Sequence, residues 1–157
     1  MESSIVIDTP LGMITITEDE GYITRVSFCN ETPSCDSIEQ VSPLLRNAAR
    51  QLLEYCGGKL TGFDLPLNPE GSDFQKNVWE ALRLIPYGET ASYKEIASSI
   101  GQPDTSRAVG AANNKNPILI IIPCHRVIGA DGSLVGYAAG LDVKKKLLAL
   151  EKATRSA

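Results

Sequence analysis

The chain has 157 residues, of which 43% are hydrophobic and 22% charged, a composition typical of folded globular proteins that excludes a disordered chain. No apolar run approaches the ~18 residues of a membrane helix, and residues 1–4 lack the character of a signal peptide, so we expect a cytoplasmic protein without membrane contact. The net charge of −4 is unevenly divided: residues 1–91 hold 6 Lys and Arg against 14 Asp and Glu, whereas residues 92–157 hold 9 against 5. A polyanionic partner would therefore bind the rear portion.

The first half of the sequence predicts a small sheet followed by one helix. Three short runs rich in β-branched residues, separated by turn compositions, predict an antiparallel meander; they are residues 5–7, 13–17 and 22–28. Residues 30–40 are predicted as a loop. Ser42 is placed to cap a helix that has Pro43 at its first position and ends at a Gly-Gly pair. Nothing in this half carries recognisable chemistry.

The composition changes near residue 70, after a stretch rich in proline and glycine. We place there the boundary between an N-terminal structural domain, residues 1–70, and a C-terminal domain, residues 71–157. Ser72 and Gln75 predict a capping box that starts the first helix of the C-terminal domain.

Two further short helices, residues 92–100 and 105–114, flank a Gly-containing turn and predict a helix-turn-helix. This pattern is weak by itself, because many helical hairpins bind nothing. The predicted fold class is α+β: a small N-terminal antiparallel sheet with a helix, followed by a mainly helical C-terminal domain whose helix-turn-helix is of the winged-helix type.

The chemistry of the chain centres on a cysteine beside the sequence's one histidine. Five aliphatic residues, 118–122, and a proline predict a buried strand that stops abruptly and places Cys124 at the mouth of whatever the strand lines. His125 follows directly. Neighbouring side chains on an extended backbone point to opposite faces, so contact between the imidazole and the sulfur requires a turn here or a bridging water.

A final helix is predicted over residues 143–152. We interpret the lysines at 144–146 as a solvated helix face. Glu151 falls in the last predicted turn, where an acidic group opposes the helix dipole, and this marks it as a candidate functional group.

A cysteine acts as a nucleophile when ionised, and a free thiol with a pKa of about 8.5 is only slightly ionised at pH 7. His125 is the imidazole available as a base, and a carboxylate would hold its tautomer. Spacing leaves that third member open among the acids of the rear portion, Glu95, Asp104, Asp131, Asp142 and Glu151. The remaining cysteines, Cys29, Cys35 and Cys56, form no CxxC pair, so we predict no metal site and interpret them as small buried or loop residues.

Several stretches together resemble the O6-alkylguanine-DNA alkyltransferase family. They are Asn116-Pro117, residues 106–110, Gly136-Tyr137, residues 147–151 and above all the specific sequence Pro123-Cys124-His125-Arg126-Val127. The resemblance covers residues 72–152 closely and the front half in size and character only. It implies a DNA repair enzyme, a methylated-DNA–protein-cysteine methyltransferase, that binds duplex DNA by the minor groove and flips an O6-alkylated guanine out of the stack.

The same resemblance implies that the alkyl group, from O6-alkylguanine and also O4-alkylthymine, moves irreversibly onto the protein's own cysteine, so that each monomeric molecule acts once and needs no cofactor. Cys124 is then the acceptor, His125 deprotonates it through a water, and Glu151 orients His125. Asn116 braces the site, and Tyr93 donates to the guanine ring. The other implied positions are the intercalating finger Arg107, the base-pocket residues Val127, Tyr137 and Ala138, and the DNA contacts Gln75, Lys94, Gln102 and Ala130.

Three other classes of protein account for parts of the sequence. A DNA-binding protein without transferase activity would keep the helix-turn-helix and the lesion pocket but lack the acceptor, and Cys124 speaks against it. A cysteine hydrolase would turn over without DNA and would leave Arg107 and the basic rear portion unexplained. A dimeric transcription factor would need a dimer seam, which the sequence does not supply.

Overall fold

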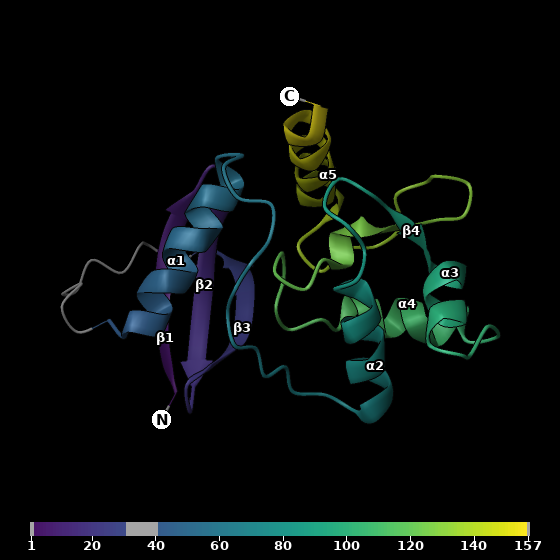
Figure 1. Ribbon diagram of the computed structural model, residues 1–157, viewed down its shortest axis with the longest axis horizontal. Coiled ribbons are helices and arrows are strands. Elements are labelled where there is room, and N and C mark those ends of the chain that lie inside the picture. The colour runs from purple at the N-terminus through teal and green to yellow at the C-terminus, as the bar shows by residue number, and fades with distance from the viewer. Residues whose placement is uncertain (1, 31–40, 157) are drawn as a thin grey trace.

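The N-terminal half is a three-stranded antiparallel sheet covered on one face by a helix (Figure 1). The computed structural model describes residues 2–30 and 41–156, with side chains through residue 154. The strands are β1 (Ser3–Thr9), β2 (Gly12–Asp19) and β3 (Tyr22–Cys29), in the order β1-β2-β3. The predicted meander is therefore confirmed, whereas most of the predicted loop, residues 31–40, lies outside the described residues.

Helix α1 (Pro43–Cys56) begins and ends as its sequence predicts. The Ser42 side chain accepts a hydrogen bond from the Leu45 amide, which satisfies one of the open N–H groups of the first turn. At the other end the Gly57 amide donates to the Leu53 carbonyl. The buried face of α1 packs on the sheet through apolar side chains, with Tyr55 among them.

The C-terminal half is mainly helical. Its elements are α2 (Asp73–Leu82), β4 (Ala91–Ser92), α3 (Tyr93–Ser99), α4 (Ser106–Asn114), the 3-10 turn η2 (Cys124–Arg126), β5 (Val127–Ile128) and α5 (Leu141–Ser156). The capping box of Ser72 and Gln75 is present at the start of α2. Helices α3 and α4 pack as the predicted helix-turn-helix, and β4 pairs in parallel with β5. The α+β fold class is confirmed.

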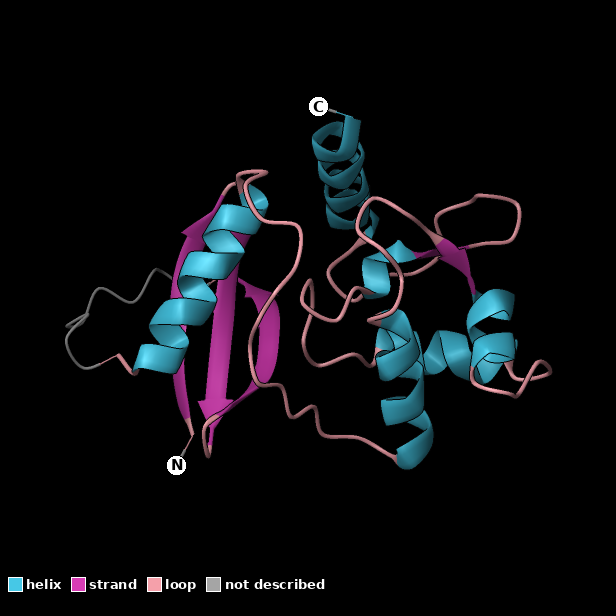
Figure 2. Cartoon of the chain, in the orientation of Figure 1, coloured by secondary structure: helices cyan, strands magenta, loops and turns pink. Residues whose placement is uncertain are grey.

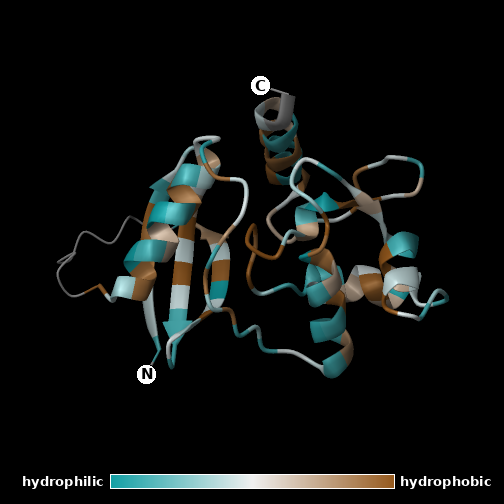
Figure 3. Cartoon of the chain, viewed as in Figure 1, coloured by the Kyte–Doolittle hydropathy of each residue, from teal (hydrophilic) through white to brown (hydrophobic). Residues whose placement is uncertain are grey.

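The aliphatic run 118–122 does not form the predicted strand. It bridges β3 only at Ile118, opposite Val26, and then turns, because Ile120 has a left-handed φ of 71°. All five side chains are nevertheless buried, and in Figure 3 the run is a hydrophobic loop between the sheet and α2. A run of consecutive apolar side chains predicts burial on all sides, and a loop inside the core is buried in this way as well as a central strand is.

One continuous hydrophobic core joins the two halves, from Ile14 in β2 and Leu52 in α1 to Trp79 in α2 and Leu147 in α5. The segment before α2 also runs along the edge of β3, where the Ile23 amide donates to the Pro66 carbonyl. The boundary near residue 70 stays a prediction. Within the described residues, no helix has the length and apolar character needed to cross a membrane.

The prediction for the last helix was wrong at both ends. It covers Leu141–Ser156, longer than residues 143–152, so Glu151 lies inside α5 and not in its last turn. The unfavourable position in the helix dipole that singled out Glu151 therefore does not exist. Figure 2 shows that a long loop leads from β5 to α5.

Candidate active site

Cys124 begins the short turn η2, immediately after the buried loop and Pro123. Cys124 is only 1% exposed, so the prediction that it lies at an open end of a strand is wrong. Burial raises the pKa of the Cys124 thiol to about 11, although a hydrogen bond from Asn116 and the positive charge of Lys144 both favour the thiolate. The Cys124 thiol is therefore protonated and enclosed in this conformation.

His125 is fully buried and is oriented by a carboxylate. Its Nε2–H donates to Glu151 Oε2 at 2.7 Å, which leaves Nδ1 as the proton-accepting nitrogen. Nδ1 is buried and has no hydrogen-bond partner among the described residues. Burial lowers the pKa of His125 despite the neighbouring carboxylate, so the imidazole is neutral at pH 7. A neutral, oriented imidazole with a free Nδ1 is suited to accept a proton.

Glu151 is the acid that the structure brings to His125, out of the five left open by spacing. It is 1% exposed and accepts five hydrogen bonds. The donors to Oε1 are the Gly88 amide and Arg126 Nε, and the donors to Oε2 are Tyr55, His125 Nε2 and Arg126 Nη2. Burial alone would raise the pKa of Glu151, but the hydrogen bonds from His125 and Arg126 hold it well below its usual range.

Asn116 braces the loop that carries Cys124. Its Nδ2 donates to the Ile122 carbonyl at 2.8 Å, and its Oδ1 accepts from the Ile118 amide at 3.0 Å. The two bonds hold the beginning and the end of the aliphatic run together. Asn116 thus fixes the backbone leading to the thiol.

Tyr93, at the start of α3, reaches across to the loop before α5. Its hydroxyl donates to the Val135 carbonyl at 2.7 Å. Of the predicted pocket residues, Val127 is fully buried and Tyr137 is 8% exposed, with a buried hydroxyl that has no partner among the described residues. The hydrogen bond from Tyr93 thus joins the start of α3 to the loop that carries Tyr137.

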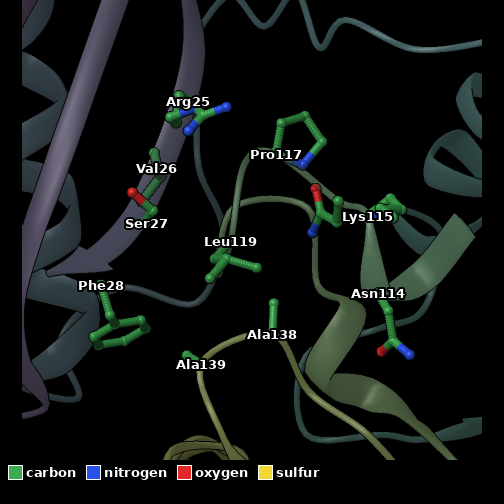
Figure 4. Close-up of a pocket in the computed structure, with 11 residues that line it drawn as sticks. Arg25, Val26, Ser27, Phe28, Asn114, Lys115, Pro117, Leu119, Ala138 and Ala139 are labelled. Carbon is green, nitrogen blue, oxygen red and sulfur yellow. The ribbon is translucent and has the colours of Figure 1, made fainter. Parts of the chain in front are cut away.

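A cavity of about 280 Å³ lies between β3, the end of α4 and the loop before α5 (Figure 4). Ala138 and Leu119 face its centre, and Asn116 also lines it. Its lining includes Ala138 of the predicted base pocket but neither Val127 nor Tyr137. The role of these three residues as a base pocket stays a prediction.

The predicted DNA-contact residues lie on the helical half. Arg107, Lys94, Gln102 and Ala130 are exposed, on or next to the helix-turn-helix and the loop after β5. Gln75 is half-buried, and its Oε1 accepts from the Ser72 amide in the capping box.

Three residues of the site were not found from the sequence. Lys144, interpreted as solvated, is fully buried, and its Nζ donates to the carbonyls of Val127, Val135 and Gly136 at 2.6, 3.2 and 3.1 Å. Its spacing from Leu147 and Glu151 is helical, and that could have placed it on the inner face. Arg126, which pairs with Glu151, lies inside the recognised motif. Tyr55 comes from the N-terminal half, where no chemistry was expected.

A metal ion has no evident place at this site. In residues 2–30 and 41–156, no group of three or more His, Cys, Asp or Glu side chains is arranged to hold one. Cys29, Cys56 and Cys124 are free thiols.

Family models match nearly the whole chain. Residues 73–153 match the DNA binding domain of 6-O-methylguanine DNA methyltransferase, and residues 4–69 match its ribonuclease-like domain. A methylated-DNA–protein-cysteine methyltransferase of Methanosarcina barkeri is 56% identical over 152 residues, 94% of this chain and 95% of that protein.

Solved structures agree with these matches. The crystal structure of the Mycobacterium tuberculosis O6-methylguanine methyltransferase superposes with a TM-score of 0.86 and 46% identity, covering 98% of this chain and 94% of that one. The M. tuberculosis OGT in complex with DNA gives a TM-score of 0.85 at 46% identity, with 95% of this chain and 92% of that chain covered.

Proposed function

This chain belongs to the 6-O-methylguanine DNA methyltransferase family, and we propose that it repairs DNA by direct reversal, taking the alkyl group of O6-alkylguanine irreversibly onto the sulfur of Cys124. Its activity is that of a methylated-DNA–protein-cysteine methyltransferase. The observation that carries the residue assignment is the state of His125, whose Nε2–H is held by the buried Glu151 while Nδ1 remains free to accept a proton.

In the proposed reaction, Nδ1 of His125 takes the thiol proton of Cys124 through a water. The thiolate attacks the alkyl carbon, so that a sulfur–carbon bond forms and the carbon–O6 bond breaks. The electron pair of that bond passes to the guanine, to which the Tyr93 hydroxyl donates a hydrogen bond. The guanine anion then takes up the proton that His125 received from the thiol, by way of water, and leaves as the neutral base. Glu151 stabilises the imidazolium that His125 becomes. Because a thioether is a poor leaving group, the protein is consumed.

Access to the sulfur requires a local rearrangement. Cys124 is enclosed, and the Tyr93 hydroxyl is engaged in a hydrogen bond with the Val135 carbonyl in the loop before α5. Entry of a flipped base breaks this bond and thereby releases the Tyr93 hydroxyl for the guanine ring. Val127, Tyr137 and Ala138 then line the base.

DNA is the partner of the helical half, and we propose that it binds through its minor groove. Helix α4 approaches the groove, with Arg107 exposed at its start to enter the stack and hold the space of the flipped base. Gln75, Lys94, Gln102 and Ala130 contact the backbone around it. We further propose that the protein acts as a monomer, accepts O4-alkylthymine and works in the cytoplasm, where the free thiols Cys29, Cys56 and Cys124 stay reduced.

Intact mass after incubation with excess duplex DNA containing O6-methylguanine tests the proposal. We expect one added methyl group per protein molecule, found on Cys124 in the digest. Cys124→Ser should gain none, whereas the control Cys29→Ser, a half-buried free cysteine away from the site, should react like the wild type. A methyl group on another residue, or more than one transfer per molecule, would refute the assignment.

A further inference from the structure

Helix α1 of the N-terminal half contributes a side chain to the catalytic cluster. Tyr55 is fully buried, and its hydroxyl donates a hydrogen bond to Oε2 of Glu151. The same hydroxyl oxygen lies 3.5 Å from Nε2 of His125. Tyr55 lies 70 positions before His125 and 96 positions before Glu151 in the sequence, and the three side chains meet at Oε2 of Glu151. The N-terminal half is therefore in contact with the acid–base pair itself.

The Tyr55 hydroxyl acts as a donor and not as a base. Burial and the adjacent Glu151 carboxylate raise the pKa of Tyr55 well above its usual range, so the proton stays on the phenol. Oε2 of Glu151 accepts from Tyr55, from His125 Nε2 and from Arg126 Nη2. Because the three donors bond the same carboxylate oxygen, the strength of its hydrogen bond with His125 depends on the bonds from Tyr55 and Arg126.

We propose that Tyr55 is a positioning residue of the transfer reaction: its hydroxyl fixes Glu151 against His125 Nε2 and weakens the pull of the carboxylate on the imidazole proton, which sets the pH below which His125 no longer accepts a proton. The proposal rests on the proposed function of Cys124 and His125. It gives the N-terminal half a part in the chemistry in addition to its place in the core.

Other ionisable groups around His125 stay in place when the Tyr55 hydroxyl is removed. They are Glu151 and Lys144 on α5, Arg126 and Cys124 on η2, Tyr87 in the loop before β4 and Tyr137 in the loop before α5. The positive charges of Arg126 and Lys144 both lower the pKa of His125. Since these charges are unchanged, a shift in Tyr55→Phe reports the hydroxyl.

The test is the pH dependence of single-turnover methyl transfer from duplex DNA, between about pH 5 and 8. Tyr55→Phe keeps the ring and leaves Oε2 with two donors, so the carboxylate holds the His125 proton more strongly. We expect the midpoint of the acid limb to move to higher pH by about half a unit or more. Tyr87→Phe is the matched control, because its ring packs edge-on against Tyr55 with centroids 6.0 Å apart, yet its hydroxyl has no hydrogen-bond partner among the described residues.

A second variant keeps the test decisive if the loss of the hydroxyl loosens the fold. A ring-fluorinated tyrosine at position 55 is a stronger donor, so the acid limb should move to lower pH. Opposite shifts in the two variants support the proposal, because loosened packing would not change sign with donor strength. An acid limb that stays at the wild-type midpoint in both, or that moves equally in Tyr87→Phe, overturns it. Wild-type protein that fails to methylate Cys124 would instead refute the proposed function.

Discussion

Replacing Glu151 with glutamine removes one buried charge and keeps the shape of the side chain. Oε1 faces two donors and Oε2 faces three, from Tyr55, His125 and Arg126. A glutamine amide nitrogen in either position points its own hydrogens at donors. Whichever way the amide turns, two or three buried donors lose their acceptor, and the Arg126 guanidinium loses its counter-charge.

The cost follows from these losses. Breaking a buried ion pair by removing one partner destabilises a protein by about 3–5 kcal/mol, and we expect Glu151→Gln to lie in this range. For a chain of this size that corresponds to a decrease in melting temperature of roughly 6–20 °C. Methyl transfer should also decrease by at least about 100-fold, because the imidazole loses the group that holds its tautomer.

Guanidinium unfolding at pH 7 measures the stability, with Glu54→Gln as the control. Glu54 pairs with Arg50 at 3.1 Å on the exposed face of α1, and exposed pairs of this spacing contribute only about 0.3–0.5 kcal/mol. Because the folded-state pKa of Glu151 is depressed, its stabilisation is fully present above the unfolded pKa of about 4.3 and is lost as the pH falls below it. The difference in unfolding free energy between wild type and Glu151→Gln should therefore stay constant from pH 7 to about pH 5 and become smaller only at lower pH. A loss below about 1 kcal/mol at pH 7 would show that the cluster does not depend on this charge.

Three further substitutions test other parts of the structure. A Cβ on Gly71 would lie 2.5 and 2.7 Å from atoms of the Trp79 ring, so Gly71→Ala should lower the unfolding free energy, measured by urea denaturation, by about 1–3 kcal/mol. Gly62 has open space around it, and Gly62→Ala should change the unfolding free energy by less than about 0.5 kcal/mol. Equal effects of the two substitutions would contradict the packing argument. Arg107→Ala should slow transfer from duplex DNA and leave the reaction with the free O6-methylguanine base unchanged, and an equal loss on both would remove its role at the DNA. Lys144→Met removes a buried donor from the carbonyls of Val127, Val135 and Gly136, although that of Val135 keeps its hydrogen bond from Tyr93. The substitution should lower the unfolding free energy by at least about 2 kcal/mol, whereas a solvated lysine would give a change within about 0.5 kcal/mol.

The elements that the sequence predicted well are those decided by neighbouring residues. The Ser42 cap of α1 and the capping box of Ser72 and Gln75 depend on contacts three residues apart, and the meander pairs strands that follow one another along the chain, so the local pattern contains the information. The Cys124-His125 pair stood out for the same reason. Two adjacent residues with complementary chemistry need no knowledge of the fold to be noticed.

The features that the sequence did not reveal depend on contacts between distant segments. The run 118–122 is buried by the sheet on one side and the helices on the other, and apolar character alone cannot distinguish that environment from a strand. Tyr55 resembles any core tyrosine until α1 is placed against α5. Helical spacing could have placed Lys144 on the inner face of α5, but its three acceptors come from β5 and from the loop before α5, and no local pattern brings those carbonyls together.

The burial of Cys124 suits the role proposed for it, that of a nucleophile that is used once. With a pKa of about 11, only about one thiol in ten thousand is ionised at pH 7, and the sulfur is closed off from solvent, so stray electrophiles rarely consume it. Reaction then requires a step that opens the loop and brings a substrate and a base together. In the proposed mechanism the hydrogen bond from Tyr93 to the Val135 carbonyl breaks, while Lys144, which donates to the same carbonyl, holds the loop from the core side. In this mechanism the thiol thus becomes exposed only when a flipped base enters the site, so that the single reaction of Cys124 is kept for the substrate.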